Sequence, residues 1–504
     1  MIMAIKKLLF PGLLVCTALA LVFRRVARPA PLKSSPNHGA YDSIDAFIEK
    51  QMRRLSIPGA SFAIVAGDQI VHCQGLGQAR PGGEAPTPQT PFFIGSLTKS
   101  ITATAVMQLV EAGQIVLDAP VQRYLPWFLV ADAKESAQMT VRHLLNQTSG
   151  LPMSAGMVTL RDFDRSPNAA ERHARTLATL GLAHPVGTVC EYCNLNYDLL
   201  GLIIETASGE TYPSYIQSHI LTPLGMSHTY TSKAAAQPDG LAVGHRYWFG
   251  LPVPVRDLPV PEGSLASGQL ISTAEDMTHY LIAHLNGGRY GGVQILSEAG
   301  IAEMHHGVAE YVKFGVSSGR YGMGWFVDDA SPVKTLTHGG NVPDFSAYMG
   351  LLPEQKKGMI LLINADHYGL PPILAEVGWG ATALLAGQPP TPVRLGFMPW
   401  LMRALLLIPL LQIVDVLGTL HLVRRWRQDP HSRPSQGRFC WRHILLPLIP
   451  NLSLAAFPIY LWASKMLGFY RLFMPDLAWI AMICGGFAGI WAFLRTGLLL
   501  RIQR

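Results

Sequence analysis

Charged side chains are scarce in this 504-residue chain. Asp, Glu, Lys and Arg make up 14% of it, whereas an average soluble domain carries about 25%. Hydrophobic residues account for 49%. A disordered protein has the opposite balance, because too few apolar groups are available to form a core. The composition therefore excludes a disordered chain and indicates apolar segments beyond those of a soluble core.

Acidic residues are missing from one end of the chain and rare at the other. Residues 1–33 contain six basic residues and no acid, and residues 394–504 contain 13 basic residues and three aspartates. The part between them, 34–393, has 21 basic and 30 acidic residues, a net charge of −9. The overall charge of +7 therefore comes from the two ends. We expect no nucleic-acid partner, because the central part has no basic excess.

The N-terminal segment, residues 1–33, is predicted to be a signal peptide or an N-terminal anchor. Lys6 and Lys7 precede an apolar run, residues 8–23, that is short for a membrane span of ~20 residues. Basic residues, a short apolar run and small residues near its end are typical of an export signal. An uncleaved anchor helix remains the alternative.

Three apolar runs near the C-terminus predict three transmembrane helices. A linker, residues 389–403, precedes them, and all three helices lie within the region 404–504. The runs are 404–423, 443–463 and 477–494. An Arg-rich loop, residues 424–442, joins the first two runs, and Lys and Arg gather on cytoplasmic flanks. We therefore predict a multi-pass protein of the cell membrane whose large domain, residues 38–388, lies on the extracytoplasmic side.

Asp415 lies inside the first apolar run. A charge within a membrane is costly and often functional. We nevertheless expect a structural contact with the polar part of the neighbouring helix around Asn451 and Ser453, because polar contacts between membrane helices are common.

Cysteine is also scarce, with six residues in the chain. Cys190 and Cys193 have C-x-x-C spacing, but no second pair or suitably spaced histidine accompanies them. We therefore expect no zinc or other metal site. A local disulfide and two free thiols both remain open.

The large domain has interleaved strand and helix patterns. Strands are predicted at 61–66 and 70–73, joined across Gly67-Asp68, and a continuous apolar strand at 358–364. Helical spacing of apolar residues predicts helices at 101–112 and 197–207.

The first chemical motif is S-L-T-K, which begins at Ser96 and ends at Lys99, directly before the predicted helix 101–112. Spacing of three residues puts both side chains on one helix face. A serine hydroxyl is a weak nucleophile until a base takes its proton, and a partly desolvated lysine can be that base. The tetrad 331–334 has the same spacing without a following amphipathic helix, so the pattern alone is weak.

Two further motifs follow. Tyr192 and Asn194 belong to a loop with the sequence Y-C-N; a tyrosine near a lysine can act as a general base, and an amide can bind a substrate amide. Residues 338–341 read H-G-G-N between apolar residues. A glycine pair in a strand is typical of a close approach by another backbone or by a substrate.

Together and in this order, the three motifs resemble those of the penicillin-recognising serine hydrolases. This family includes class C β-lactamases, D-alanyl-D-alanine carboxypeptidases, and related esterases and D-amino-acid peptidases. The resemblance covers about residues 40–388. It implies an α+β fold, in which helices flank an antiparallel sheet and a helical subdomain is added.

The resemblance also implies catalytic roles. Ser96 would attack a carbonyl and form an acyl-enzyme that water then hydrolyses. Lys99 and Tyr192 would relay the proton, with Tyr192 as the base.

Substrate binding would fall to Asn194, which would hold the substrate amide, and to the strand of His338, Gly339, Gly340 and Asn341. The backbone N–H groups of Ser96 and Asn341 would form the oxyanion hole. Many relatives carry Lys-Thr-Gly where this chain has His-Gly. Because a neutral imidazole recognises a carboxylate weakly, true β-lactamase activity is less expected than esterase or D-amino-acid peptidase activity.

We therefore predict a membrane-anchored, exported serine hydrolase that cleaves an ester or an amide, with a cell-wall D-amino-acid peptide as one candidate. Its partners would be a small molecule or a peptide such as a peptidoglycan fragment, and the membrane; no cofactor is expected. The alternative is a catalytically silent module that binds β-lactams or peptidoglycan and signals through the membrane helices. A pure binding module does not need the proton relay of Ser96, Lys99 and Tyr192.

Overall fold

The computed structural model describes residue 39 and residues 41–503, apart from 161, 165, 167, 256–259, 314–315, 368, 370 and 391–397. The predicted signal or anchor segment, 1–33, lies outside these residues. The chain divides into two compact units. Of the described residues, the larger unit contains those from 39 to 246 and from 254 to 390, and the smaller contains 247–253 and those from 398 to 503.

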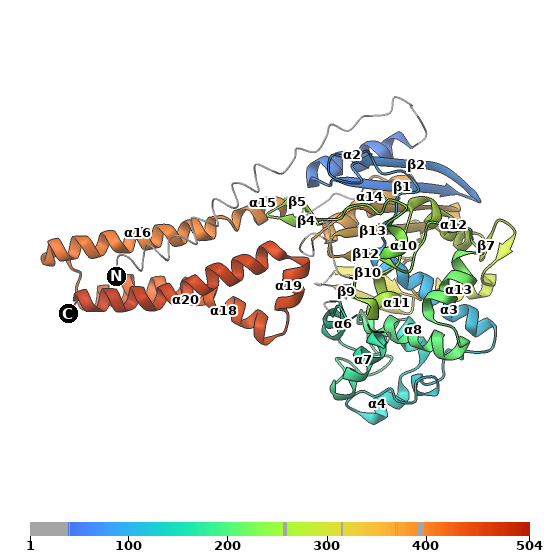
Figure 1. Ribbon diagram of the computed structural model, residues 1–504, viewed down its shortest axis with the longest axis horizontal. Helices are drawn as coiled ribbons and strands as arrows, with labels where there is room; N and C mark the ends of the chain where they lie inside the picture. The colour runs from blue at the N-terminus through green and yellow to red at the C-terminus, as the bar shows by residue number, and fades with distance from the viewer. Residues whose placement is uncertain are drawn as a thin grey trace. The chain divides into compact units, whose positions relative to one another are not determined.

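An eight-stranded antiparallel sheet is the centre of the larger unit (Figure 1). Its strands, in spatial order, are β2 (Gln69–Gly77), β1 (Gly59–Ala66), β14 (Lys357–Ile363), β13 (Phe345–Leu352), β12 (Thr335–Val342), β11 (Phe326–Asp328), β10 (Val316–Tyr321) and β9 (Ala309–Lys313). The first strands of the chain therefore pair with a strand almost 300 residues later, since Ala63 lies opposite Ile360. This pairing joins strands from the beginning and the end of the large domain's sequence in one sheet.

The strands predicted from the sequence are confirmed: β1 and β2 are longer than predicted, and β14 is shifted by one residue toward the N-terminus. β1 and β2 form a hairpin across Gly67-Asp68, and Gly67 has φ +64°, a conformation that glycine adopts without a steric penalty. β1 and β13 are buried along nearly their whole length, because both faces of the sheet are covered by helices.

Helices cover the sheet on its two faces. α14 (Pro371–Leu385) packs on β13 and α2 (Asp42–Leu55), and the Tyr348 hydroxyl lies 3.0 Å from Thr382 Oγ1. α12 (Ala274–Leu285) packs on β14 and β1, and its Met277 joins Met349 of β13 in the main core. Alternate residues of β13 thus face different helices, as the period of two in a strand requires.

A helical subdomain is formed by the part of the sequence between β3 (Phe92–Phe93) and β9. Its longest members are α3 (Thr98–Glu111) and α8 (Asn194–Ser208). Both predicted helices are confirmed, but each begins three residues earlier than its apolar pattern. α8 ends at Gly209, which has φ +75°, a common helix stop. The architecture is the predicted α+β fold.

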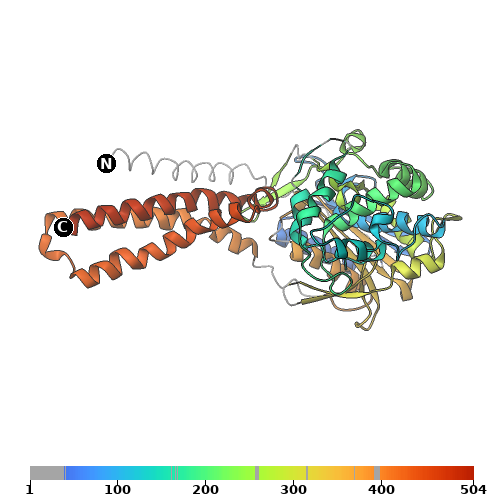
Figure 2. The same ribbon diagram turned by 90° about the horizontal axis from the view of Figure 1, so that it is seen from below.

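The smaller unit contains three helical segments that are long and apolar enough to cross a membrane: Trp400–Gln428, Gln436–Ala463 and Pro475–Gln503. They include α16 (Leu407–Gln428), α18 (Leu446–Ala463) and α20 (Pro475–Gln503). α18 and α20 run side by side in both views (Figures 1 and 2). The three apolar runs predicted from the sequence are therefore confirmed as helices.

Asp415 of α16 contacts α20. Trp491 Nε1 donates to its Oδ2 at 2.7 Å, and Arg495 Nε lies 3.5 Å from its Oδ1. Asn451 instead donates to Pro447 O of its own helix at 2.8 Å. The expected contact with the region of Asn451 was wrong, because a carboxylate within an apolar helix bundle is better compensated by an opposite charge than by a neutral amide.

Candidate active site

Ser96 lies in a short 3-10 turn, η1 (Gly95–Leu97), that leads directly into α3. Gly95 has φ +55°, and a Cβ at this position would lie 2.5 Å from the backbone nitrogen of Asn341. Glycine therefore lets β12 approach the turn closely. This approach brings the first and third motifs of the sequence together.

Lys99 occupies the first turn of α3 and is completely buried. Its Nζ lies 3.0 Å from Ser96 Oγ, 2.8 Å from Asn194 Oδ1 and 2.6 Å from the carbonyl oxygen of Ser267. An ammonium group has three N–H donors, so these three acceptors satisfy it. A neutral amine would donate to two of them and accept the proton of the serine hydroxyl.

Burial lowers the pKa of Lys99 to about 7, opposed by the nearby carboxylate of Asp198. Asp198 is buried in α8, and burial raises its pKa to about 7, whereas Ser267 and Lys99 lower it. Two such groups titrate as a pair. Near neutral pH the lysine amine can therefore be unprotonated, which a base acting on Ser96 requires.

Tyr192 lies in the extended segment that precedes α8, half-buried among aromatic rings. Its ring stacks on Phe326 with centroids 6.5 Å apart, and Lys99 Nζ lies 4.9 Å from its centroid. Burial raises the pKa of Tyr192 well above its usual value, although a hydrogen bond with Ser96 lowers it. The phenol therefore keeps its proton at neutral pH, which favours Lys99 over Tyr192 as the first proton acceptor.

Asn194 begins α8 and is held close to α6 (Met153–Thr159). A Cβ on Gly156 would lie 2.6 Å from the backbone nitrogen of Asn194. The absence of a side chain at Gly156 thus permits this contact. Since Asn194 Oδ1 accepts from Lys99, its amide NH₂ group can still donate to a substrate carbonyl.

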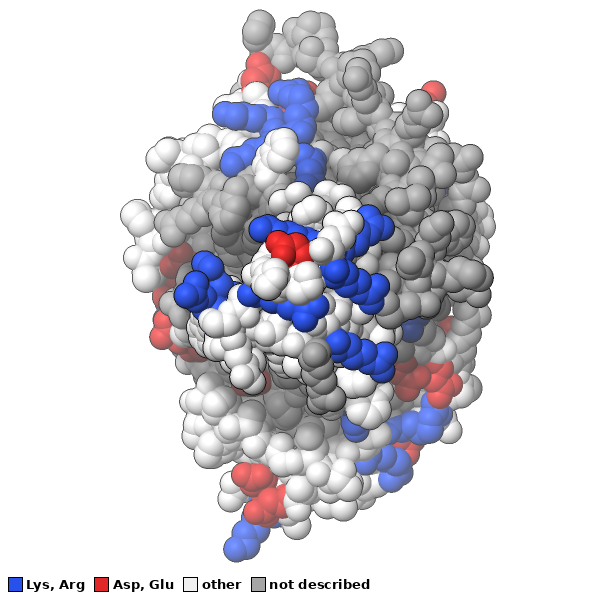
Figure 3. Space-filling view, turned by 90° about the vertical axis from the view of Figure 1, so that its left-hand side faces the viewer, with Lys and Arg blue, Asp and Glu red and all other residues white. Residues whose placement is uncertain are grey.

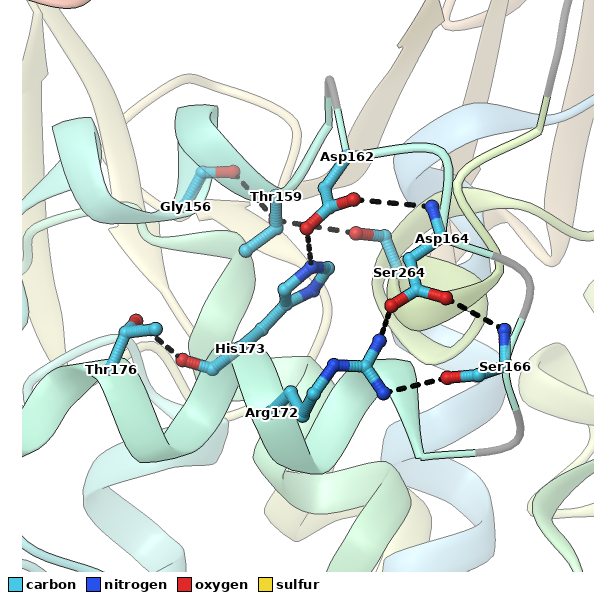
Figure 4. A network of polar contacts seen from close by, with 9 residues as sticks. All are labelled: Gly156, Thr159, Asp162, Asp164, Ser166, Arg172, His173, Thr176 and Ser264. Carbon is cyan, nitrogen blue, oxygen red and sulfur yellow. Dashed lines mark hydrogen bonds and ion pairs between the residues drawn. The ribbon is translucent and has the colours of Figure 1, made fainter.

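The chain after α6 is fixed to α7 (Ala169–Arg175) by polar contacts (Figure 4). His173 Nε2 lies 2.7 Å from Asp162 Oδ2, and Arg172 pairs with Asp164. The side chains of α7 and the preceding loop point toward one another in this view. They hold a segment whose conformation the sequence alone could not predict.

His338 lies on β12 and is buried. Its Nδ1 is 2.7 Å from its neighbour's carbonyl oxygen, that of Gly339, and its Nε2 is 3.2 Å from the hydroxyl of Tyr321. Because a carbonyl only accepts, Nδ1 carries the proton and Nε2 accepts from the tyrosine. Burial, with the nearby charge of Lys99, lowers the pKa of His338 to about 3. The imidazole is therefore neutral at pH 7, as predicted, and both nitrogens are engaged within the protein.

The two glycines of β12 have different surroundings. A Cβ on Gly340 would lie 2.0 Å from the carbonyl oxygen of Ile94 and 3.2 Å from the nitrogen of Ser96, whereas a Cβ on Gly339 would meet nothing within 4 Å. Gly340 thus brings β12 against the turn of Ser96. This contact brings together the backbone N–H groups of Ser96 and Asn341, the two groups that were predicted to form the oxyanion hole.

Asp366 of β15 (Ala365–Asp366) holds the side chain of Asn341. Its Oδ1 accepts from Asn341 Nδ2 at 2.8 Å and from Ser346 Oγ at 2.6 Å. Burial raises the pKa of Asp366 to about 7, opposed by these two hydrogen bonds. The end of β12 that carries the predicted oxyanion donor is therefore fixed from outside the strand.

All eight residues predicted for the site lie in the larger unit. Lys99 contacts Ser96, Asn194 and the ring of Tyr192, and β12 supplies the other four. Asp198 and Ser267 were not predicted. Asp198 had a readable signal, because it is the only charged residue in the apolar run 195–204 and lies one turn after Asn194. The sequence contains no pattern that would have predicted the role of the Ser267 carbonyl.

Cys190 and Cys193 are both buried and free. The structure therefore favours two thiols over a disulfide. Within the described residues, no group of three or more His, Cys, Asp or Glu side chains could hold a metal ion.

Comparisons with known proteins give a consistent result. The family described as Beta-lactamase matches residues 44–377. Penicillin-binding protein 4 of Amycolatopsis lactamdurans is 33% identical over 314 residues, which cover 61% of this chain and 81% of that protein. Protein flp of Staphylococcus aureus (strain MW2) is 28% identical over 341 residues, which cover 66% of this chain and 65% of the length of flp.

Solved structures are similar to the same part of the chain. The octameric penicillin-binding protein homologue from Pyrococcus abyssi has a TM-score of 0.61 and 31% identity, covering 70% of this chain and 78% of that one. SurE, solved with D-Leu, has a TM-score of 0.55 and 25% identity with the same coverage.

Proposed function

The chain belongs to the beta-lactamase family of serine hydrolases, and from this premise we propose that it is a membrane-anchored, exported enzyme that cleaves an ester or amide through an acyl-enzyme on Ser96. The contact between Lys99 and Ser96 carries the proposal. The amine lies 3.0 Å from the hydroxyl, and burial lowers its pKa to about 7. Such an amine is a suitable general base near neutral pH.

In the proposed acylation, neutral Lys99 takes the proton of the Ser96 hydroxyl while Oγ forms a bond to the substrate carbonyl carbon. The carbonyl electron pair moves to oxygen, where the N–H groups of Ser96 and Asn341 stabilise it. When the tetrahedral intermediate collapses, the leaving group departs with a proton from the Tyr192 hydroxyl, which Lys99 restores. Water then attacks the acyl-enzyme and returns the proton to Ser96.

We propose an ester or a D-amino-acid peptide as substrate, in preference to a β-lactam. Recognition of the β-lactam carboxylate needs a cation, whereas His338 is neutral at pH 7 and both of its nitrogens are engaged. The relative SurE was solved with D-Leu, which supports a D-amino-acid residue in the substrate. A cell-wall peptide would provide such a residue.

Anchoring in the membrane is proposed from the three apolar helices. The arginines between the first two helices favour a cytoplasmic loop. The hydrolase domain would then lie on the extracytoplasmic side, where a cell-wall substrate is found.

Labelling with a fluorescent fluorophosphonate, and separately with a fluorescent penicillin, tests the nucleophile. We expect the wild-type chain to be labelled by the fluorophosphonate and the Ser96→Ala variant to remain unlabelled. Ser331→Ala is the matched control, because Ser331 begins the second S-x-x-K tetrad but lies in an exposed turn, where it donates to Asp328 at 2.5 Å. Equal labelling of wild type and Ser96→Ala would refute the assignment.

A hydrolysis assay and a thermal-shift assay decide between the enzyme and the silent sensor module. A sensor would bind fluorescent penicillin or peptidoglycan fragments and raise its melting temperature, yet hydrolyse no member of an ester and D-amino-acid peptide panel. The arrangement of Ser96, Lys99 and Tyr192 favours the enzyme, because reversible binding does not require a deprotonated lysine beside a serine.

A further inference from the structure

Exposed arginines gather at one end of the three-helix unit. Six of them are exposed: Arg424, Arg425, Arg427, Arg438, Arg442 and Arg501. We call this set the arginine collar. It is formed by the end of α16, the start of the second apolar segment and the end of α20. Figure 3 shows blue side chains around a small red patch at the end that faces the viewer.

The positive charge of the arginine collar is balanced by almost no acidic residues. Asp429 is the single acidic residue between positions 416 and 475, and it accepts from the backbone of His431 at 3.1 Å. Among the residues that the structure describes, none of the six collar arginines has an ion-pair partner within 4 Å. Their guanidinium groups are therefore available to an anion from outside the chain.

The scaffold beneath the collar is packed. Trp426 is buried with Phe439 and Leu499, and these residues belong to three different helical segments. The Trp426 and Phe439 rings lie 5.8 Å apart. Arginines that project from a packed cluster lose less conformational freedom on binding than arginines of an unstructured loop.

The choice of arginine over lysine points to phosphate. Retention of a flank in the cytoplasm can use Lys or Arg, and elsewhere this chain uses both. Yet neither 424–442 nor 495–504 contains a lysine, and the positive charges there are all arginines. A guanidinium group presents paired N–H donors that match two phosphate oxygens, whereas an ammonium group acts as a point charge.

Apolar surface continues from the collar along the same helices. Trp441, Leu445 and Ile449 are 59%, 46% and 60% exposed, and Phe493 of α20 is 82% exposed. Acyl chains could lie on this surface while a headgroup meets the arginines. A soluble phosphate compound or a nucleic acid has no acyl chains and would not cover this apolar surface.

We propose that the arginine collar binds the phosphate groups of anionic phospholipids, with acyl chains against the exposed apolar faces of the helices. The site depends neither on hydrolysis nor on which side of the membrane the collar lies. Its failure is therefore distinct from a failure of the proposed enzyme.

The test uses the full chain in detergent micelles that contain equal amounts of phosphatidylglycerol and phosphatidylcholine. Native mass spectrometry measures how much of each lipid the protein retains. We expect at least about fivefold preference for phosphatidylglycerol, because the zwitterionic lipid has no net charge. Inorganic phosphate, added as a competitor, should displace little lipid, because it lacks acyl chains.

Two variants separate a guanidinium site from general attraction. In the first, Arg424, Arg425 and Arg427 are changed together to Lys, which keeps the charge and hence the membrane orientation. It should lose about threefold or more of the preference. In the matched control, Arg54, Arg80 and Arg123 of the larger unit, all exposed, are changed together to Lys, and the preference should stay unchanged.

The proposal is overturned if the wild-type chain retains both lipids equally, if the collar Lys variant retains as much phosphatidylglycerol as wild type, or if inorganic phosphate removes the lipid. Circular dichroism and thermal unfolding of each variant show that the protein, including its helical unit, is folded, so that a loss of lipid is not mistaken for unfolding.

Discussion

Replacing Asp198 by Asn should make Ser96 reactive at lower pH. The carboxylate of Asp198 favours the charged form of Lys99, and so raises a lysine pKa that burial lowers to about 7. Without this charge the pKa of Lys99 falls further. The amine is then neutral, and able to take the serine proton, at pH values where the wild-type amine is still protonated.

The expected size follows from the fraction of neutral amine. Because the pKa of Asp198 is itself raised to about 7, the carboxyl loses its charge below this pH, and its effect on Lys99 is present near and above pH 7. With a pKa of about 7, about 50% of Lys99 is neutral at pH 7, and a decrease of about one pKa unit, or about 1.4 kcal/mol, raises that fraction to about 90%. The Asp198→Asn variant should therefore react about twofold faster than wild type near pH 7 and equally fast well above it.

The assay is the rate of fluorophosphonate labelling from pH 5 to 9, which needs no knowledge of the natural substrate. Asp344→Asn is the matched control, because Asp344 is also a buried carboxyl whose pKa burial raises to about 7, yet the charges that act on it are those of Arg246, Lys233 and Asp366. The acid limb of its pH–rate profile, where the labelling rate rises with pH, should stay at the wild-type position. Thermal unfolding of both variants shows whether they are folded.

Two results would refute the reasoning. If the wild-type rate still rises steeply at pH 9, either the pKa of Lys99 is not lowered or another group is the base. If the acid limb of Asp198→Asn stays in place or moves to higher pH, the carboxylate does not act on Lys99.

Further predictions concern β12 and the thiols. Gly340→Ala should reduce labelling of Ser96 by about a hundredfold or prevent folding, because its Cβ would meet Ile94 O at 2.0 Å, whereas Gly339→Ala should keep most activity; equal effects would contradict the distinction. His338→Lys should speed labelling by fluorescent penicillin about tenfold, because a cation in this position can pair with a carboxylate; the neutral His338→Gln should not. Asp366→Ala should lower kcat more than it raises KM in a peptide assay, since it frees the Asn341 side chain, and Asp366→Asn should restore part of the loss. Dithiothreitol should leave the melting temperature unchanged, because Cys190 and Cys193 are free; a decrease would indicate a disulfide.

Features that depend on neighbours in the sequence were predictable. The hairpin across Gly67-Asp68, the three apolar helices and the spacing of Ser96 and Lys99 all follow from local patterns. The start of α3 was placed three residues late, because an apolar pattern begins at the first apolar residue. The helix itself begins where backbone hydrogen bonding begins, at Thr98.

Features that depend on distant contacts were not predictable. The glycine pair of β12 indicated a close approach, but only the structure shows that Gly340 makes it and Gly339 does not. Asp415 was expected to contact α18, whereas it contacts Trp491 and Arg495 of α20. Each of these outcomes is decided by the rotation of one element against another, which no local pattern records.

The position of Asp198 gives α8 two functions at once. Asn194 begins this helix and accepts from the Lys99 amine at 2.8 Å, and one turn later Asp198 provides the charge that opposes the effect of burial on the same amine. Burial alone would lower the pKa of the lysine too far and make it a weak base, whereas an exposed lysine would be protonated at neutral pH. A carboxylate on the helix that already positions the amine keeps its pKa near the pH at which a general base is most effective, and any movement of α8 relative to α3 would change both the contact and the pKa together.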